Sequence, residues 1–477
     1  MAGEGQHKDK AEAVGAVNIE EIYIRTADKN YFDLSNYVQN ILIYENIGQS
    51  CLTGSIGIAD SSNFLGKLNL KGKEIITMKI KSPFLQDGDD IHRSFVAYSI
   101  SDRIQQDDRQ QFMKINFISM EGAKDISTRL SRKFSGPTDT IAQEVFNQYV
   151  QEPRIYDKEG NPTGPVTPLL IGGTPHKTNN FAFVANNWSA IETLNFVAKN
   201  SEPADVDSKQ VLPNCLFFET RTGFYFGTLT DYILGQKRKN LIYNEYNFIP
   251  ALDQSFAQNE ERLTYGSYNY ISHFVSNQYQ VPSSSNFDEH FNELKNQRTG
   301  YYGTHTIGID MVNRLNYQMI FDYVGNLEDA NPNNRVNKKW EDFAHVTDHK
   351  PFAETPIYNP RALQRVKVGA SNLFDSDEFG YDMAYFERIS LRPTAIAEQK
   401  RLKVVIEVPG MTDVQVGYLV RLNYPSVGEK LTGDSSQDTL DPDVSGLYTI
   451  SGIIHNISAQ QHSMKLELVR DSFGDDR

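Results

Sequence analysis

A short β-pattern that occurs twice, once near each end of the 477-residue chain, constrains the fold more than any other feature. Residues 98–118 read YSISDRIQQDDRQQFMKINFI and residues 448–469 read YTISGIIHNISAQQHSMKLELV, so YSIS matches YTIS and MKINFI matches MKLELV. In each copy two apolar, β-rich runs flank a polar linker, which is typical of an antiparallel hairpin. An internal repeat of this kind predicts two similar β-units.

A glycine-led apolar run precedes each hairpin, so the repeat is longer than the hairpin alone. GKEIITMKIKSP spans 72–83 ahead of the first copy, and GYLVRLNYPS spans 417–426 ahead of the second. Another alternating run, at 52–62, contains Gly54 and Gly57. Glycine inside a strand is typical of a bulge, or of the bends that barrels use at their corners. This pattern favours a barrel for the first unit.

The first unit opens with a second predicted hairpin. IEEIYIRT and YFDLSNYVQNILIYENI flank a polar turn at 28–30. Alternating apolar residues on both sides of such a turn predict a hairpin, here with a long second strand. The polar segment QQDDRQQ marks the tip of the hairpin that closes the unit.

The hydrophobic period changes to that of helices after the first unit. TDTIAQEVFNQYV, at 138–150, carries an apolar or aromatic residue at every fourth position, ending at Tyr149, and Thr138 or Asp139 is a candidate N-cap. NNWSAIETLNFVAKNSE contains a Ser-x-x-Glu capping box ahead of a second apolar stripe. CLFFETRTGFYFGTL, at 215–229, predicts a hairpin with its turn at 221–223. These elements predict a compact α/β insertion.

The predicted fold class is mainly β with α+β insertions: two similar β-barrel, tube-like domains, an α/β insertion domain and a further peripheral insertion. The second β-unit is split, because loop-like and mixed segments separate its first strands from its last. The predicted boundaries are a flexible N-terminal arm at 1–17, the first β-barrel at 18–122, the α/β insertion at 123–235, the second β-barrel at 236–279 and 395–471, and the peripheral insertion at 280–394.

Composition excludes several classes of protein. The formal net charge is −14 with no basic tract, which argues against sequence-specific nucleic-acid binding. No segment approaches ~20 apolar residues and the N-terminus lacks a signal-peptide core, so we expect no membrane span and no export by the usual route. One disulfide between Cys51 and Cys215 would be allowed, but two inert thiols fit a protein made in a reducing cytoplasm better.

Residues that could carry catalysis or bind a metal do not form a recognisable site. His345 and His349 are four residues apart with Asp342 and Asp348 nearby, but the glutamate of a zinc-protease helix is missing. The acidic run at 87–90 lacks the glutamate and spacing of a calcium loop, and the glycine pair at 172–173 is not followed by a phosphate-binding lysine. We therefore predict a protein that is not an enzyme, with no catalytic, cofactor-binding or metal-binding residues.

The order of these parts resembles a known family. LTGSIGIADSSNFLGKLNLKGKEIITMKI (52–80), MKINFISMEGAKDI (113–126), NNWSAIETLNFVAKNS (186–201) and the closing strands VQVGYLVRLNY, GLYTISGIIHNIS and MKLELV carry the resemblance. They are similar to the baseplate hub protein of T4-type contractile-tailed phages, a relative of the hub part of type VI secretion spike proteins. The resemblance covers most of the chain, and the extra length falls mostly in 151–180 and 280–394.

The resemblance implies an assembly rather than a reaction. In that family two similar barrels per chain form a homotrimer, a ring of six near-equivalent domains that joins a six-fold tail tube to a three-fold spike. The implied partners are the central spike protein through its OB-fold end, the tail tube or a tube-initiator protein, wedge proteins and the tape-measure protein. DNA would only pass through the lumen. The implied location is the tail baseplate of the virion, after synthesis in the host cytoplasm.

The tips of the two matched hairpins are the candidate assembly contacts. They are equivalent under the duplication, and a solvated turn is the competing interpretation of each. The candidate residues are Asp107, Asp108, Arg109, Gln110, Ser458, Ala459, Gln460 and Gln461. Two alternative functions stay open at this point: a tail-associated cell-wall hydrolase or protease, with its site in 280–394, and another tail structural protein such as a tube or wedge component.

Overall fold

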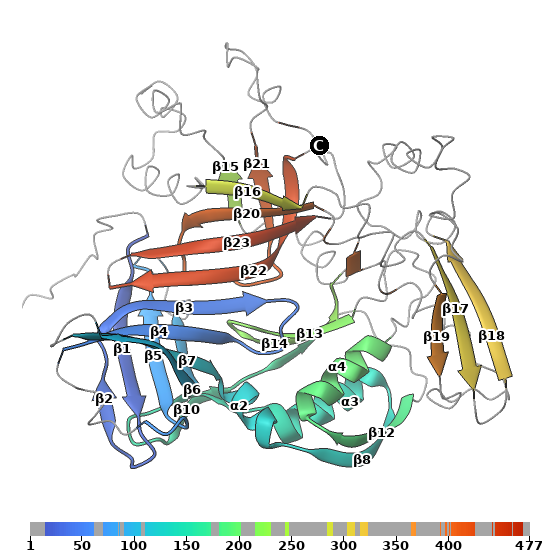
Figure 1. The fold of residues 1–477 in the computed structure, drawn as a ribbon, viewed down its shortest axis with the longest axis horizontal. Coiled ribbons are helices and arrows are strands. Elements are labelled where there is room, and N and C mark those ends of the chain that lie inside the picture. The colour runs from blue at the N-terminus through green and yellow to red at the C-terminus, as the bar shows by residue number, and fades with distance from the viewer. Residues whose placement is uncertain are drawn as a thin grey trace, which may run out of the picture.

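The computed structural model describes residues 15–61, 70–83, 85, 90–105, 110–172, 181–201, 215–229, 244–247, 284–289, 303–310, 315–322, 364–368, 392, 396–397, 400, 402–424, 441, 444–459 and 461–470. Over these residues the chain is mainly β, as the sequence predicts. One 13-stranded sheet dominates the molecule, and four sheets of two or three strands accompany it (Figure 1). The helices in the described ranges lie together below the large sheet in that view.

The N-terminal part of the large sheet is built from seven strands, and its side chains form one hydrophobic cluster, here called core 1. The sheet order is β3-β4-β7-β6-β5-β1-β2. Core 1 contains the buried apolar residues of these strands, such as Ile56 and Phe95. The strands are β1 (Asn18–Arg25), β2 (Tyr31–Asp33), β3 (Val38–Asn46), β4 (Thr53–Asp60), β5 (Ile75–Lys81), β6 (Ile91–Gln105) and β7 (Gln111–Ser119).

The C-terminal part repeats the arrangement with six strands around a second cluster, core 2. Its order is β16-β20-β23-β22-β21-β15, so each strand takes the place of one in β3-β4-β7-β6-β5-β1. The order of these strands along the chain is also the same in both parts. One pairing differs: β15 runs parallel to β21, whereas β1 runs antiparallel to β5. The strands are β15 (Asn244–Asn247), β16 (Ser284–Glu289), β20 (Leu402–Pro409), β21 (Leu419–Asn423), β22 (Gly446–Ser458) and β23 (His462–Arg470).

The two hairpins of the sequence repeat carry a β-bulge at the same place. In β6–β7 the register shifts after the pair Ala97–Phe117, and in β22–β23 it shifts after Ile450–Leu468. Phe117 and Leu468 are equivalent in the match of MKINFI to MKLELV, so that part of the predicted alignment is confirmed. In the structure Ala97 is equivalent to Ile450. The match of YSIS to YTIS instead makes Ile100 equivalent to Ile450, so the two alignments differ by three residues. That half of the alignment is wrong: YSIS and YTIS contain only two apolar–polar alternations each, and so short a pattern does not fix the register of a strand with a bulge.

Two other strand predictions need correction. The predicted long second strand of the first hairpin breaks at 34–37, where the Tyr37 and Val38 amides both bond to the Leu34 carbonyl. Only the three residues of β2 pair with β1, and β3 turns away to pair with β4. β16 falls inside the predicted peripheral insertion, yet it pairs with β20 in the large sheet.

The segment between the two β-units packs helices against short strands around a third cluster, core 3, which includes Ile141, Leu194 and Phe217. Three small sheets belong to it: β8–β12, β9–β10 and β11–β14–β13. Its elements are α2 (Met120–Ser127), β8 (Leu130–Gly136), α3 (Thr138–Val145), the π-helical turn η1 (Phe146–Val150), β9 (Pro153–Tyr156), β10 (Pro162–Val166), β11 (Leu169–Ile171), β12 (Phe181–Trp188), α4 (Ala190–Asn200), β13 (Cys215–Thr220) and β14 (Gly223–Thr228).

The helix signals in this segment are partly confirmed. Ser189 and Glu192 form the capping box of α4, with both reciprocal hydrogen bonds present. The predicted N-cap of α3 is wrong: Pro137 holds that position, and Thr138 is already helical. The apolar stripe of α3 also shifts after Val145, because the π-helical turn adds a residue and buries Phe146 and Val150 instead of Tyr149.

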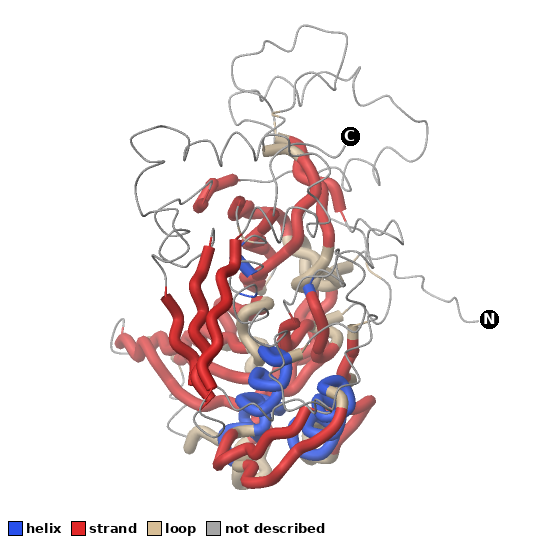
Figure 2. The backbone as a smooth tube through the Cα atoms, turned by 90° about the vertical axis from the view of Figure 1, so that its right-hand side faces the viewer, coloured by secondary structure: helices blue, strands red, loops and turns tan. Residues whose placement is uncertain are grey.

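The fourth small sheet contains β17 (Gly303–Asp310), β18 (Leu315–Asp322) and β19 (Gln364–Val368), with β18 antiparallel and β19 parallel to β17. This sheet stands to one side of the rest, at the right of Figure 1 and in the foreground of Figure 2. His345 and His349 lie outside the described residues. Among the residues that are described, no helix is long and apolar enough to cross a membrane, and no group of acidic, histidine or cysteine side chains could hold a metal ion.

Within the described ranges neither β-unit closes into a barrel. The large sheet branches at β22, and its described strands end at β2, at β16 and, on the branch through β21, at β15. The two predicted barrels therefore occur as two halves of one continuous sheet, joined where β22 pairs with β3.

Candidate functional site

The joint between the two β-units is a strand pairing that brings residues more than 400 positions apart into one sheet. β22 is long enough to serve both halves. Its first residues pair with β21, and residues from Gly452 to Ser458 pair antiparallel with β3. Accordingly Ile453 packs into core 2, whereas Ile457 packs into core 1. The joint is therefore a shared element and not a surface contact between finished domains.

In addition to this strand pairing, side-chain hydrogen bonds connect the two β-units. The Val416 amide donates to Glu45 Oε2 at 3.3 Å. Ser82 and Thr412 exchange bonds: the Thr412 amide donates to Ser82 Oγ at 3.2 Å, and the Ser82 amide donates to Thr412 Oγ1 at 3.4 Å. Burial raises the pKa of Glu45 to about 7, although the Val416 amide opposes the shift. The carboxyl group at the joint therefore changes charge near neutral pH.

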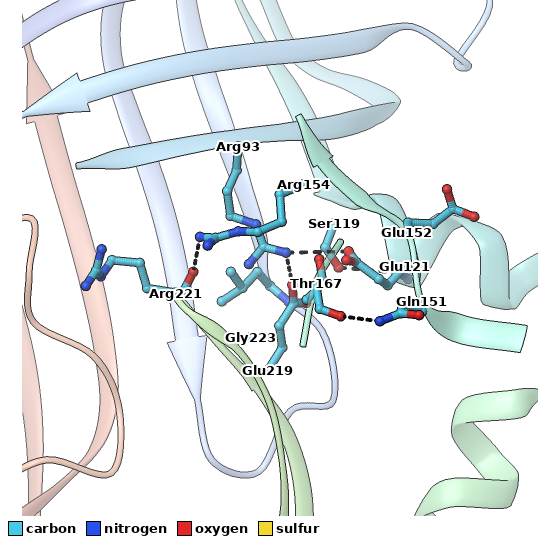
Figure 3. A network of polar contacts seen from close by, with 12 residues as sticks. Arg93, Ser119, Glu121, Gln151, Glu152, Arg154, Thr167, Glu219, Arg221 and Gly223 are labelled. Atoms are coloured by element: carbon cyan, nitrogen blue, oxygen red, sulfur yellow. Dashed lines mark hydrogen bonds and ion pairs between the residues drawn. The ribbon is translucent and has the colours of Figure 1, made fainter. Parts of the chain in front are cut away.

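A buried ionic cluster ties the first β-unit to the α/β segment (Figure 3). Arg93 on β6 donates through Nη2 to Glu219 Oε1 at 2.6 Å and to Glu121 Oε2 at 3.5 Å, and through Nη1 to the Thr220 carbonyl at 3.3 Å. The other oxygen of Glu219 accepts a bond from the Leu52 amide at 2.7 Å. All three charged side chains are at most 2% exposed. Strand β6, helix α2 and strand β13 are thus fixed to each other by one guanidinium.

The charges in this cluster do not cancel. Two carboxylates face Arg93, and burial raises the pKa of Glu121 to about 7, with the attraction of Arg93 lowering it and the repulsion of Glu219 adding to the rise. Burial lowers the pKa of Arg93, but Glu219 and Glu121 raise it by more, so the guanidinium stays charged. The cluster of Arg93, Glu121 and Glu219 is neutral when Glu121 takes up a proton.

The turn between β13 and β14 extends the contacts to the second β-unit. Arg154 of β9 donates to the Arg221 carbonyl at 3.0 Å, and Arg221 donates to the Asp90 carbonyl at 3.3 Å. Thr222 Oγ1 donates to Gln415 Oε1 at 2.8 Å. One two-residue turn therefore touches the first β-unit, the α/β segment and the loop before β21. Sequence reasoning predicted the turn but not this role, because nothing in Arg-Thr-Gly distinguishes a three-way contact from a solvated turn.

The predicted contact residues at the hairpin tips have different surroundings. Asp107, Asp108 and Arg109 lie outside the described residues, as does Gln460, and Gln110 is exposed. Ser458 and Gln461 close the second tip through the Ser458 amide, which donates to the Gln461 carbonyl at 2.8 Å. Gln461 also forms a β-bridge with Ala16. Gly15 and Ala16 therefore lie against the second tip.

The two cysteines, and the two histidines of the second hairpin, are buried or partly buried. Cys51 and Cys215 are free, and burial raises the pKa of both thiols, that of Cys215 to about 12. His455 and His462 face each other across the second hairpin with Nδ1 and Nε2 3.1 Å apart, and burial lowers both pKa values. One hydrogen bond thus joins two buried imidazoles across the hairpin.

No protein-family model and no curated protein matches this chain. It is similar to the solved tail protein from Neisseria meningitidis MC58, with 9% identity and a TM-score of 0.47 over 94% of this chain and 96% of that one. The 43 kDa tail protein of prophage MuSo2 from Shewanella oneidensis gives 9% identity and a TM-score of 0.47 over 94% and 98%. The E. coli c3393 protein, described as a type VI secretion component similar to T4 bacteriophage tail proteins gp27 and gp5, gives 7% identity and a TM-score of 0.37 over 92% and 75%.

Proposed function

We propose that this chain is the baseplate hub of a contractile phage tail, a homotrimeric ring that joins a six-fold tube to a three-fold spike. The observation that carries the proposal is the repeated strand arrangement: six strands occur twice in the same order, along the chain and across the sheet. Three such chains present six similar units. A ring built from them can meet six-fold symmetry on one side and three-fold symmetry on the other.

The joint supports a structural role for the repeat. β22 and β3 place the two units side by side in one sheet, so their relative position is fixed by main-chain pairing. We propose that the units are the barrels at 18–122 and at 236–279 with 395–471, extended by β16, and that 123–235 and 280–394 are the inserted domains. Barrel closure would then need strands of neighbouring chains.

The proposed partners follow from the ring. A spike protein would bind its three-fold face through an OB-fold end, a tube or tube-initiator protein would bind its six-fold face, and wedge proteins would bind outside. The tape-measure protein and later DNA would pass through the lumen in the virion baseplate. The hairpin tips at 107–110 and 458–461 are the proposed contact residues for the neighbours along the tail axis.

The experiment is the absolute mass of the purified chain by light scattering, alone and with its spike partner. We expect a mass of three times 54.1 kDa and a stable complex on addition of the spike. A mass of six chains would favour a tube component. A monomer that persists at high concentration, with and without the spike, would remove the hub proposal.

A further inference from the structure

In the part of the chain that the structure describes, no strand covers the edge of the outer half of β6, whereas the matching edge of β22 is covered. β22 pairs with β21 over its first residues and with β3 over 452–458. β6 pairs with β5 from Ile91 to Val96, and one more hydrogen bond runs from the Ala97 amide to the Glu74 carbonyl. After Ala97, no strand in the described part of the chain pairs with this edge of β6. Burial follows the difference: Ile100 is 43% exposed, whereas its equivalent Ile453 is 1% exposed.

The other end of the sheet carries the matching edge. β3 has β4 on one side and β22 on the other. Its equivalent, β16, has β20 on one side and ends the sheet on the other among the described strands. Among the described strands there is therefore one unpaired β6 edge and one unpaired edge of β3 type. An open, partly apolar strand edge is a template for adding another strand.

We infer that β6 of one copy pairs antiparallel with β16 of the next copy, repeating between chains the pairing that β22 and β3 make within one chain. The occupant of the β6 edge is thus a second copy of this chain. The inference rests on the proposed ring and gives it a specific interface. The contact is heterologous, and closing it around three copies leaves neither edge free.

The register of this pairing can be copied from the joint. Ile457 pairs with Ile41 within the chain. Gln105 is equivalent to Ile457, since they face Gln111 and His462 at matching places in their hairpins. Ser285 is equivalent to Ile41, since they face Ile406 and Ile56 at matching places in β20 and β4. Gln105 of one copy should therefore lie opposite Ser285 of the next.

The test is disulfide formation between Gln105→Cys and Ser285→Cys in one full-length chain. Residues directly opposite in an antiparallel pair have Cα atoms about 4.5–5.5 Å apart, a distance that suits a disulfide. We expect covalent dimers and trimers on a non-reducing gel. The control pair Ser101→Cys with Ser285→Cys is displaced by about 13 Å along the strand and should give none. The parent chain measures any background from Cys51 and Cys215.

A second variant tests the same edge without a covalent bond. Ile100→Lys is expected to leave the isolated chain folded, because the side chain is half exposed, and to lower the mass from three chains to one. Val184→Lys, on β12, replaces a strand residue elsewhere that is even more exposed, at 61%, and should leave the trimer intact.

The outcomes separate the two proposals. A trimeric parent that neither cross-links at 105 and 285 nor responds to Ile100→Lys would overturn the β6–β16 interface and leave the hub proposal standing. A monomeric parent would overturn both. Open filaments in the electron microscope, cross-linked at the same pair, would support the pairing and contradict the closed ring.

Discussion

The two β-units bury an arginine at the same end but from different strands. In the first unit it is Arg93 on β6, whose equivalent in β22 is Gly446. In the second it is Arg470 on β23, which lies over Gly446, donates to the Ser445 carbonyl at 2.7 Å and sits 5.6 Å from the Tyr448 ring centre. Among the described residues, Arg93 faces two carboxylates, both from the α/β segment, and no ion pair is formed by Arg470. In the first β-unit the buried arginine therefore attaches the unit to the α/β segment. In the second β-unit the buried arginine bonds within its own unit.

The sheet interiors differ in a second, compensating way. Gly54 on β4 lies opposite Phe117, and at the equivalent place Val404 on β20 lies opposite Leu468. The first unit combines a very small residue with a very large one, and the second unit has two residues of middle size. The summed side-chain volume of the pair is therefore similar in both units. Cores tolerate exchanges that keep volume and pattern. The units therefore share topology and bulge position while their packing is individual.

Removing the attachment arginine should have the largest effect. Arg93→Met leaves Glu121 and Glu219 buried without their cation, which typically costs about 3–5 kcal/mol. Arg470→Met loses a hydrogen bond and a cation–π contact, and should cost about 1–2 kcal/mol. Urea unfolding of both variants at pH 8 measures the difference. An equal loss of unfolding free energy in the two variants would contradict different roles for the two arginines. The Arg93→Met cost should shrink toward pH 5, as Glu121 takes up a proton.

Exchanging the core pair between units should have the next largest effect. A Cβ on Gly54 would lie 2.3 Å from both the Leu42 carbonyl and the Phe117 ring, so Gly54→Val should destabilise the chain at the upper end of the about 1–3 kcal/mol typical of overpacking. Phe117→Leu should recover part of this loss, with a coupling free energy of at least about 1 kcal/mol in a double-mutant cycle. Strictly additive effects would show that the two residues do not compensate.

The carboxyl group at the joint should give the smallest effect and a pH signature. Glu45 has a folded-state pKa raised from 4.5 to about 7, so the folded chain binds more protons than the unfolded chain between these values. Its contribution therefore favours folding below pH 4.5 and is lost as pH rises through 7. Glu45→Gln should stabilise the chain at pH 8, on the order of 1 to 3 kcal/mol, and flatten the pH dependence between 5 and 7. Thermal unfolding at pH 5 and 8 checks this, and a variant with an unchanged pH slope would contradict it.

Local signals were enough to predict much of the fold. The glycines ahead of each unit's repeated strand, Gly72 and Gly417, both have positive φ, at 85° and 87°. The capping box at Ser189 and the hairpin turn before Gly223 are also where the sequence places them. Each of these features is set by residues a few positions apart, so a single sequence carries its signal.

Long-range pairing was not predictable in the same way. The joint of β22 with β3 and the place of β16 depend on which edge meets which, and alternating strands offer many equivalent choices. The bulge after Ala97 moves the register without a glycine or proline to mark it. Arg93 appears in sequence as one polar residue of a strand, since its partners Glu121 and Glu219 are brought to it only by the fold.

The pairing of β22 with β3 also sets an order of events during synthesis. β3 and its neighbours leave the ribosome early, but the strand that covers the free edge of β3 is made only when residues 452–458 appear. Until then the N-terminal sheet carries open edges at both β3 and the outer half of β6. Contacts of such long sequence separation form slowly, and exposed edges in the meantime favour aggregation. Nascent chains of this protein are therefore expected to depend on chaperones until the last hairpin is released.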